Sequence, residues 1–307
     1  MQLTQQYLDL YSLRFLDLLN LGIGDIPKTW NAIVPTVIQS RKAYEEIMAH
    51  SGLGLLQTMN EGASVTYDAM RVRGKKRFTP IIRTLGVKWT KQSETKDVNG
   101  FIKQIGPQLG RSVTASMNLW AANLLTLGST TRGVKDLDGT ALISSSHKVG
   151  TTGATASNLI SQPLSALALE NAIATAKAAP NETGLPFRYY AGGFNLVVPT
   201  GLEAVAQRVA QSMKLAGTND NDENIYNRSM IKNVHCEQLL GFNESALANN
   251  WYLVPVSANE NPFIYLEVQA PQTTIAPDPD HLGMKMITDM ECLFEAKDWR
   301  GVVGSIL

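Results

Sequence analysis

The first part of the chain predicts two amphipathic helices. Over residues 3–20 apolar side chains recur every three or four positions, so a helix there would carry one apolar stripe. The residues of that stripe are Leu3, Tyr7, Leu10, Tyr11, Phe15, Leu18 and Leu19. A second helix is expected over residues 36–50, where Thr36 is a suitable cap and apolar and charged faces alternate. Residues 1–62 are therefore interpreted as an arm that packs on an apolar surface elsewhere.

From residue 63 to residue 91 the hydrophobic period changes to two, which indicates β-strands. The segment predicts a hairpin with its turn at residues 73–75, Arg-Gly-Lys. The hairpin is strongly basic, because no acid occurs between Asp68 and Glu94. Its bases are Arg71, Arg73, Lys75, Lys76, Arg77, Arg83, Lys88 and Lys91.

The clustered positive charge of this hairpin favours a projecting ribbon. Each arm of roughly nine residues would reach about 30 Å, and an isolated two-stranded ribbon is marginally stable in water. Because like charges repel, we expect the ribbon to dock on an acidic surface. A candidate is the polar insert that contains Asp220, Asp222 and Glu223. The alternative is a hairpin that stays solvated or lies on its own domain.

The longest helical pattern covers residues 101–127. Pro107 is expected to mark the first turn of this helix or a kink, because an internal proline removes a backbone hydrogen bond. Residues 128–161 are rich in Gly, Ser and Thr and are interpreted as a loop with one short strand at residues 141–143. A further helix is predicted over residues 164–179.

A second domain is predicted to open with a buried strand after a turn at residues 181–186. The strand FNLVV at residues 194–198 leads through a Pro-Thr-Gly break into a helix at about residues 202–215. Further strands are expected near residues 231–235, 251–256, 263–268 and 284–294.

The charge of the chain is balanced, with 27 Lys and Arg against 27 Asp and Glu, so a dedicated DNA-binding protein is not expected. The two cysteines, Cys236 and Cys292, form no CxxC motif, which favours reduced thiols over a disulfide framework or a zinc site. The amino terminus lacks the basic start of a secretory signal. No apolar run approaches the roughly 18 residues of a membrane span.

The sequence contains no recognisable catalytic or cofactor motif. The histidines are His50, His147, His235 and His281, and none belongs to an HExxH motif or a metal-binding pair. Ser146 and His147 are adjacent, but neighbours in a chain rarely face one another as a catalytic dyad requires. Glycine pairs at Gly22 and Gly52 lack the spacing of a phosphate-binding loop. We therefore expect no enzyme, no cofactor and no metal site.

The order of these parts and several local phrases resemble the major capsid proteins of tailed bacteriophages with the Hong Kong 97 fold, in particular the Mu-like major head subunit family. The phrases are GVKWTK at Gly86–Lys91, DGTALISSSHKVG at Asp138–Gly150, FNLVVPTGLEAVAQRV at Phe194–Val209 and DWRGVVGS at Asp298–Ser305. No single phrase is specific, so the resemblance rests on their order over about 220 residues.

The resemblance implies an α+β fold of the Hong Kong 97 type. Its parts would be an N-terminal arm at 1–62, an extended β-hairpin loop at 63–95, a peripheral domain with the spine helix at 96–193, an axial domain at 194–270 and a return strand at 271–307. The basic loop would contact a neighbouring subunit. Its contact residues would be Arg71, Arg73, Lys75, Lys76, Arg77, Arg83 and Lys88.

The implied function is self-assembly into the hexamers and pentamers of an icosahedral virion shell around double-stranded DNA, which is contacted without sequence readout. The chain would be made in the host bacterial cytoplasm and would have no membrane partner. Because the basic loop begins only about 63 residues into the chain, a separate scaffolding protein is expected, with a portal and decoration proteins as further partners. Two alternatives stay open, an encapsulin-like compartment with a protein cargo and a hydrolase that uses Ser146 or His147.

Overall fold

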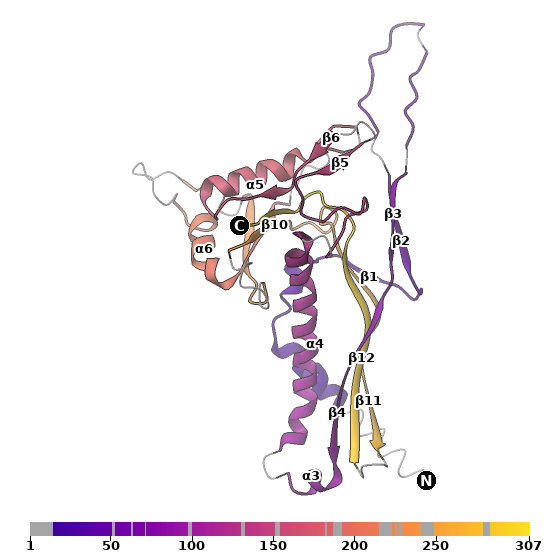
Figure 1. Ribbon diagram of the computed structural model, residues 1–307, viewed down its shortest axis with the longest axis vertical. Helices are drawn as coiled ribbons and strands as arrows, with labels where there is room; N and C mark the ends of the chain where they lie inside the picture. The colour runs from indigo at the N-terminus through magenta and orange to yellow at the C-terminus, as the bar shows by residue number, and fades with distance from the viewer. Residues whose placement is uncertain are drawn as a thin grey trace.

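The helix α4 (Phe101–Thr126) and three long strands run side by side along the longest dimension of the molecule (Figure 1). A second body of helices and short strands lies at the upper end in that view, and a narrow ribbon rises beside it. The computed structural model describes residues 15–50, 53–62, 64–70, 72–97, 100–129, 133–150, 154–181, 183–186, 192–214, 223–224, 226, 229–240, 249–278 and 283–307.

The long strands belong to a four-stranded sheet with the order β1-β11-β12-β4. Its strands are β1 (Val37–Gln39), β4 (Ile81–Thr90), β11 (Phe263–Asp278) and β12 (Gly283–Ala296). The even-numbered residues of β12 from Met286 to Ala296 are buried and the odd-numbered ones are more exposed, as expected when one face of a sheet is covered. The helix α4 covers that face, where Val113 and Met117 join Met290 in the largest core. The strands predicted near residues 263–268 and 284–294 are thus confirmed.

The helix α4 confirms the longest helical prediction. It begins at Phe101 because the Asp97 carboxylate accepts hydrogen bonds from the backbone N–H groups of Phe101 and Ile102, at 2.9 and 3.0 Å. Pro107 lies inside the helix, so of the two expectations the first turn is wrong and the kink stays a prediction. The carboxylate cap sets the start of the helix, and the proline costs it a single backbone hydrogen bond.

A helix at residues 15–25 crosses α4 with the two backbones in contact. A Cβ added at Gly22 would lie 2.1 Å from the carbonyl oxygen of Pro107, and one added at Gly110 would lie 2.2 Å from that of Leu19. Only glycine allows such an approach. In the sequence Gly22 lacks the spacing of a phosphate-binding loop. In the structure it allows the close packing of the two helices. The remainder of the predicted 3–20 helix lies outside the described residues.

We predict that Gly22→Ala destabilises the protein by about 1–3 kcal/mol, because the new methyl group forces the two helices apart. Gly24→Ala is the matched control. It lies in the same helix, an added Cβ there meets nothing within 4 Å, and the change should be neutral or stabilise by up to about 1 kcal/mol. Urea unfolding of the variants measures both effects, and equal effects would contradict the close crossing.

The second body is built on a five-stranded sheet with the order β7-β13-β10-β8-β9. Its strands are β7 (Leu159–Ile160), β8 (Phe194–Val198), β9 (Ile231–Cys236), β10 (Trp251–Pro255) and β13 (Val303–Ser305). The helix α5 (Ala166–Ala178) and the pair η2 (Thr200–Leu202) and α6 (Glu203–Ala210) pack with them. The predicted helices and strands of this region are confirmed, although α6 ends earlier than expected.

The two sheets divide the chain differently from the predicted boundaries. Leu169 and Ile173 of α5 share a core with β8, so this helix belongs with the five-stranded sheet and not with the spine helix. The strand β11, predicted within the axial segment 194–270, pairs with β12 in the other sheet. The C-terminal strand β13 lies beside β10. Strand pairing joins segments that are distant in sequence, so continuous boundaries do not describe these bodies.

The helix predicted over residues 36–50 is wrong, because this segment contains β1 and β2 (Glu45–His50). The strand β1 pairs in parallel with residues 265–267, and β2 pairs antiparallel with β3 (Val72–Phe78). These partners come from distant parts of the chain. Their backbone hydrogen bonds outweigh a local helical periodicity, which is a weak preference.

The predicted hairpin turn at residues 73–75 is also wrong, because these residues lie inside β3. The strands β3 and β4 do not pair with each other. Instead β3 pairs with β2 and β4 pairs with β12, with Thr79 and Pro80 between them. The ribbon is therefore β2 and β3, and the described part of the loop that joins them is residues 53–62 and 64–70, here called the loop at residues 53–70.

Short elements complete the fold: α2 (Trp30–Ile33), α3 (Lys91–Thr95), η1 (Leu127–Ser129), β5 (His147–Val149) and β6 (Ala154–Ala156). The strand predicted at residues 141–143 is wrong. Of these residues Ala141 makes an isolated bridge to Lys135, while Leu142 and Ile143 are buried in the core. Their burial explains the apolar run that the sequence pattern assigned to a strand.

The segment 27–33 joins the two bodies, and buried asparagines hold it. Asn118 on α4 donates to the first carbonyl of the segment at 3.0 Å and accepts from the backbone N–H of Trp30 at 3.2 Å. The amides of Asn195 and Asn261 donate to its last carbonyls at 2.9 and 3.0 Å. An irregular segment can be buried only when its backbone groups are satisfied, and these amides do so.

Candidate functional site

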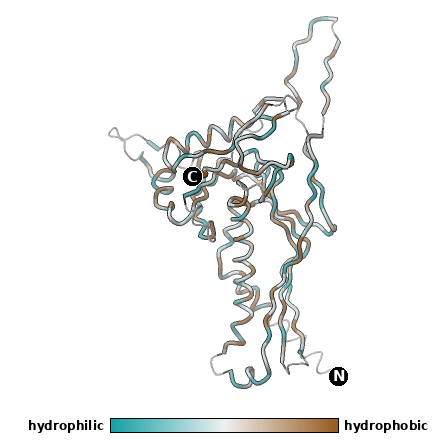
Figure 2. Tube along the Cα trace, in the orientation of Figure 1, coloured by the Kyte–Doolittle hydropathy of each residue, from teal (hydrophilic) through white to brown (hydrophobic). Residues whose placement is uncertain are grey.

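The loop at residues 53–70 projects beyond both bodies (Figure 1). Figure 2 shows hydrophobic residues along it, although it lies away from either core. Its large apolar side chains are each more than half exposed, namely Leu53, Leu55, Leu56, Met59, Val65, Tyr67 and Met70. Such a concentration of exposed apolar surface is typical of an interaction site.

The two arms of this loop are in contact at one point, where the Asp68 carboxylate accepts a hydrogen bond from the backbone N–H of Gly54 at 2.8 Å. Side chains of extended chains alternate between two faces. Five of the seven large apolar residues stand at odd-numbered positions, namely Leu53, Leu55, Met59, Val65 and Tyr67, so an extended arm carries them on one of its two faces.

The charge of the projecting loop is opposite to the sequence expectation. Its charged residues are Glu61 and Asp68, and it contains no base. The basic residues of the predicted ribbon lie instead on β3 and β4, closer to the body of the molecule. The error follows directly from the misplaced hairpin turn.

On one face of the ribbon, Glu46 of β2 lies between two bases of β3. Its carboxylate is 2.7 Å from Lys75 Nζ and 2.9 Å from Arg77 Nη2. The guanidinium of Arg77 also lies 4.1 Å from the ring centroid of Tyr44. Hydrogen bonds from Lys75 and then Arg77 lower the pKa of Glu46. Exposed ion pairs are individually weak, so the two ion pairs of Glu46 and the contact of Arg77 with Tyr44 stabilise the ribbon together.

Lys76 faces the body and anchors the ribbon to its own subunit. Its Nζ lies 3.2 Å from the Glu295 carboxylate and donates to the carbonyl oxygens of Lys135 and Ala296, at 2.6 and 2.9 Å. The end of the ribbon nearest the body therefore lies on its own domain, which agrees with the alternative to docking that the sequence left open.

The predicted contact residues are thus not a single surface. Lys75, Lys76 and Arg77 have acidic partners in their own chain, whereas Arg83 and Lys88 lie on β4. Glu223 is exposed, and its backbone makes an isolated β-bridge with Lys214. Four positions lie outside what the structure describes, namely Arg71, the side chain of Arg73, Asp220 and Asp222. A contact of the basic residues with a neighbour stays a prediction.

We predict that Lys75→Glu combined with Arg77→Glu opens the ribbon, because both new acids would face Glu46. Hydrogen exchange of the β2 amides should accelerate, and adding Glu46→Lys should slow it again. Arg41→Glu is the control, since Arg41 is exposed and has no acidic partner among the described residues. Unchanged exchange in the double variant would contradict this role of Glu46.

The lowered pKa of Glu46 also predicts a pH dependence. A carboxylate whose pKa is lower in the folded state stabilises that state above its unfolded value, near 4.5, and this contribution is lost as the pH falls through the folded pKa. Exchange of the β2 and β3 amides, corrected for intrinsic rates, should therefore accelerate below about pH 4.5. Glu46→Gln should remove this step, and a step that persists in it would assign the effect to another group.

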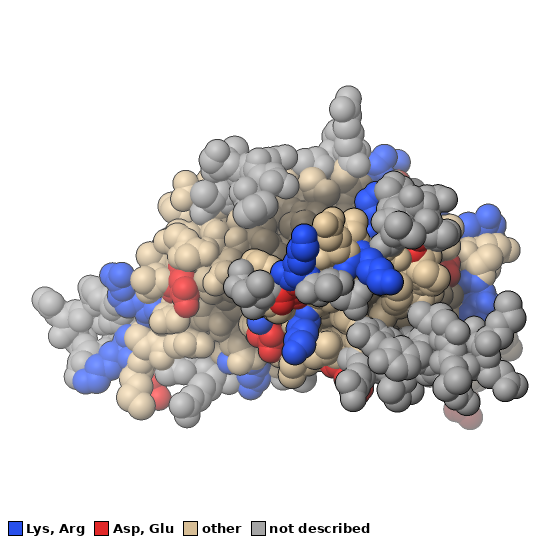
Figure 3. Space-filling model, turned by 90° about the horizontal axis from the view of Figure 1, so that it is seen from below, with Lys and Arg blue, Asp and Glu red and all other residues tan. Residues whose placement is uncertain are grey.

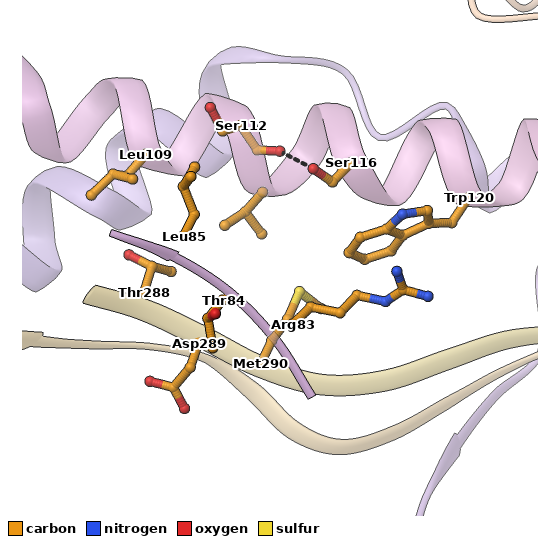
Figure 4. A pocket seen from close by; sticks show the side chains of 11 residues that line it. Arg83, Thr84, Leu85, Leu109, Ser112, Ser116, Trp120, Thr288, Asp289 and Met290 are labelled. Carbon is orange, nitrogen blue, oxygen red and sulfur yellow. Dashed lines mark hydrogen bonds between the residues drawn. The ribbon is translucent and has the colours of Figure 1, made fainter. Parts of the chain in front are cut away.

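A small groove of about 90 Å³ opens between α4 and the strands β4 and β12 (Figure 4). The guanidinium carbon of Arg83 lies 3.8 Å from the ring centroid of Trp120 at one end. The buried Nε of Arg83 makes no hydrogen bond within the described part of the chain. The apolar wall consists of Leu85, Leu109, Val113 and Met290, and Ser112, Ser116, Thr84, Thr288 and Asp289 add polar groups.

The charge around the lower end of the molecule is mixed. Figure 3 shows Lys and Arg groups beside Asp and Glu groups among mostly uncharged residues. This distribution agrees with the balanced composition of the chain. It is not the continuous basic surface that a dedicated DNA-binding protein presents.

His147 is a core residue. It is fully buried, its ring stacks on Trp299 with centroids 4.3 Å apart, and its Nε2 is 3.0 Å from Asn158 Oδ1. The ring is thus enclosed and inaccessible to a substrate.

Within the described residues no group of three or more His, Cys, Asp or Glu could hold a metal ion. Burial raises the pKa of Cys292 to about 11, which keeps the thiol protonated and unreactive.

The amide of Asn158 satisfies backbone groups that would otherwise be buried without partners. It donates to the carbonyls of Leu142 and Val302, at 2.8 and 3.1 Å, and accepts from the N–H of Ser144 at 2.8 Å. Asn158→Ala should destabilise the protein by roughly 2–4 kcal/mol. The exposed Asn171→Ala should change stability by less than about 0.5 kcal/mol. Thermal unfolding compares them, and a mild effect at Asn158 would contradict this assignment.

The described part of the chain contains no helix that is both long and apolar enough to cross a membrane. The architecture combines two packed bodies with an apolar loop and a helical arm, and no described part of the chain covers the loop. These features define a protein of the kind that assembles with other copies.

A model of the phage capsid protein family matches residues 75–305, which is most of the chain. The chain therefore belongs to the phage capsid protein family. A search of curated proteins found no match. The match begins within β3 and includes the whole five-stranded sheet and every strand of the four-stranded sheet except β1.

Solved capsid structures have the same fold. The mature capsid of bacteriophage PhiM1 covers 91% of this chain and 86% of its own at 10% identity, with a TM-score of 0.57. The procapsid of bacteriophage JBD30 covers 98% and 75% at 15% identity, with a TM-score of 0.54. A virus-like particle from Pyrococcus furiosus covers 96% and 99% at 9% identity, with a TM-score of 0.56. The expected α+β fold of the Hong Kong 97 type is confirmed.

Proposed function

We propose that this chain is the major shell subunit of a tailed bacteriophage and that it assembles with itself into hexamers and pentamers of an icosahedral head. Membership of the phage capsid protein family supports this proposal, as do the assembled capsids among the structures of the same fold. Within this fold we assign the chain to the Mu-like major head subunits, on the local phrases quoted above.

The observation that carries the proposal is the exposed loop at residues 53–70. A free subunit would leave its apolar side chains in water, whereas burial is worth roughly 25 cal/mol for each Å² removed from water. Contacts around a closed ring reinforce one another, so modest individual contacts can hold a stable shell. Assembly therefore supplies the cover that the subunit lacks.

The proposed shell encloses double-stranded DNA and contacts it without sequence readout, in keeping with the balanced charge. We further propose that a separate scaffolding protein directs assembly in the host cytoplasm and that a portal occupies one vertex, with decoration proteins as further partners. The subunit itself acts as a structural protein and not as an enzyme.

Expression of the chain with and without its scaffold tests the proposal. Light scattering and negative-stain imaging should reveal closed particles of uniform diameter. Particles that enclose a protein cargo and no DNA during infection would favour the encapsulin-like compartment instead. A chain that stays monomeric under both conditions would refute the shell function.

A further inference from the structure

Three buried polar atoms lie at the junction between the segment 27–33 and the five-stranded sheet. They are Thr29 Oγ1, His235 Nε2 and Glu237 Oε2, and none of them makes a hydrogen bond within the described part of the chain. Glu237 is 3% exposed. Buried polar atoms nearly always have partners, so unsatisfied atoms gathered at one junction indicate a ligand site.

The spacing of the imidazole and the carboxylate fits a shared metal ion better than a hydrogen bond. His235 Nε2 lies 3.5 Å from Glu237 Oε2. A charge-assisted hydrogen bond would bring such atoms to roughly 2.7–2.9 Å. Two ligands at zinc distances of about 2.0–2.2 Å in a tetrahedral arrangement are separated by about 3.3–3.6 Å. The pair is therefore spaced as two ligands of one ion.

Thr29 supplies a third oxygen from a distant part of the chain. Burial raises the pKa of Glu237, but contacts that include the His235 ring and the Thr29 hydroxyl outweigh this effect and lower the pKa overall. The hydroxyl thus lies beside the carboxylate. His235 and Glu237 are fewer than three His, Cys, Asp or Glu ligands, and a hydroxyl from another element completes the set.

Hydrogen bonds to neighbouring groups hold these ligands in place. Glu237 Oε1 accepts from the backbone N–H of Leu239 at 3.1 Å. The backbone N–H of Glu237 donates to the Val198 carbonyl at 2.9 Å, just beyond β9. The asparagine contacts described above hold the segment 27–33 against the same sheet. Groups that are already held lose little conformational freedom when they bind a ligand.

We propose that Thr29, His235 and Glu237 bind a divalent transition-metal ion such as Zn²⁺, with water as a further ligand, and that the ion joins the segment 27–33 to the end of β9. Imidazole nitrogen with carboxylate oxygen is a ligand set of Zn²⁺, whereas Mg²⁺ and Ca²⁺ prefer oxygen alone. Cys236 takes no part, because successive residues of a strand face opposite sides and its Sγ lies 4.0 Å from Thr200 Oγ1 in η2. The site belongs to a single subunit and does not depend on the proposed shell function.

Calorimetric titration of the purified, metal-free full-length chain with Zn²⁺ tests the proposal. The wild-type chain should bind Zn²⁺ one-to-one. Loss of an outer-shell partner typically weakens metal binding 10–100-fold, so His235→Ala and Glu237→Gln, which remove direct ligands, should each weaken it by at least about a hundredfold. Cys236→Ser is the matched control in the same strand and should bind as the wild type does. Circular dichroism establishes that each variant folds.

Two further measurements use the wild-type chain alone. Saturating Zn²⁺ should raise its thermal unfolding midpoint by at least about 3 °C, and Mg²⁺ should not. Bound Co²⁺ should give the intense visible absorption of a tetrahedral site. Absence of one-to-one Zn²⁺ binding in the wild-type chain would overturn the proposal and leave the three atoms to a water molecule. Binding that survives both His235→Ala and Glu237→Gln, or that is lost in Cys236→Ser, would overturn it as well.

Discussion

The packing of α4 on the long β11 and β12 strands is the interaction on which the rest of the structure depends. At its upper end Trp30, Tyr265 and Phe294 form an aromatic cluster, with ring centroids 4.6–5.8 Å apart. This cluster joins the segment 27–33 to both strands, and the same core continues into β10 of the second body. The ribbon is fixed to this core because β3 continues into β4, which pairs with β12, and the helix at residues 15–25 is fixed to it through the segment 27–33.

The attachment of the ribbon illustrates the consequence. Lys76 reaches the Glu295 carboxylate and the Ala296 carbonyl at the end of β12, so the ribbon leaves the body at a defined place. Beyond that anchor the backbone pairing of β2 with β3 is supported by exposed ion pairs, and no described part of the chain covers the apolar side chains of the loop at residues 53–70. Stability therefore falls from core to tip, which suits a part that becomes ordered by contact with another copy.

Local patterns predicted the elements whose stability is local. The spacing of apolar residues identified α4, α5 and α6, and apolar runs identified β8, β10, β11 and β12. In each of these segments the apolar residues pack on a core, so the pattern within the segment is enough to predict it. The segment 36–50 was mistaken for a helix since both of its strand partners lie far away in the sequence. The misplaced turn had the same cause. The acids that neutralise β3, Glu46 and Glu295, lie outside the basic segment, so the segment alone looked more exposed and more basic than it is.

The sequence by itself determined the class of fold, the long helix, the strand-rich remainder and the absence of a catalytic motif, because these follow from periodicity and residue chemistry within short windows. The order of its local phrases also indicated a phage capsid protein, and the comparison confirmed that family. Only the tertiary structure decided which segment projects, which charges remain unpaired and where the groove lies. Those properties arise from pairing between residues that are distant in the chain, and the free energy of such pairing is not encoded in any single window of sequence.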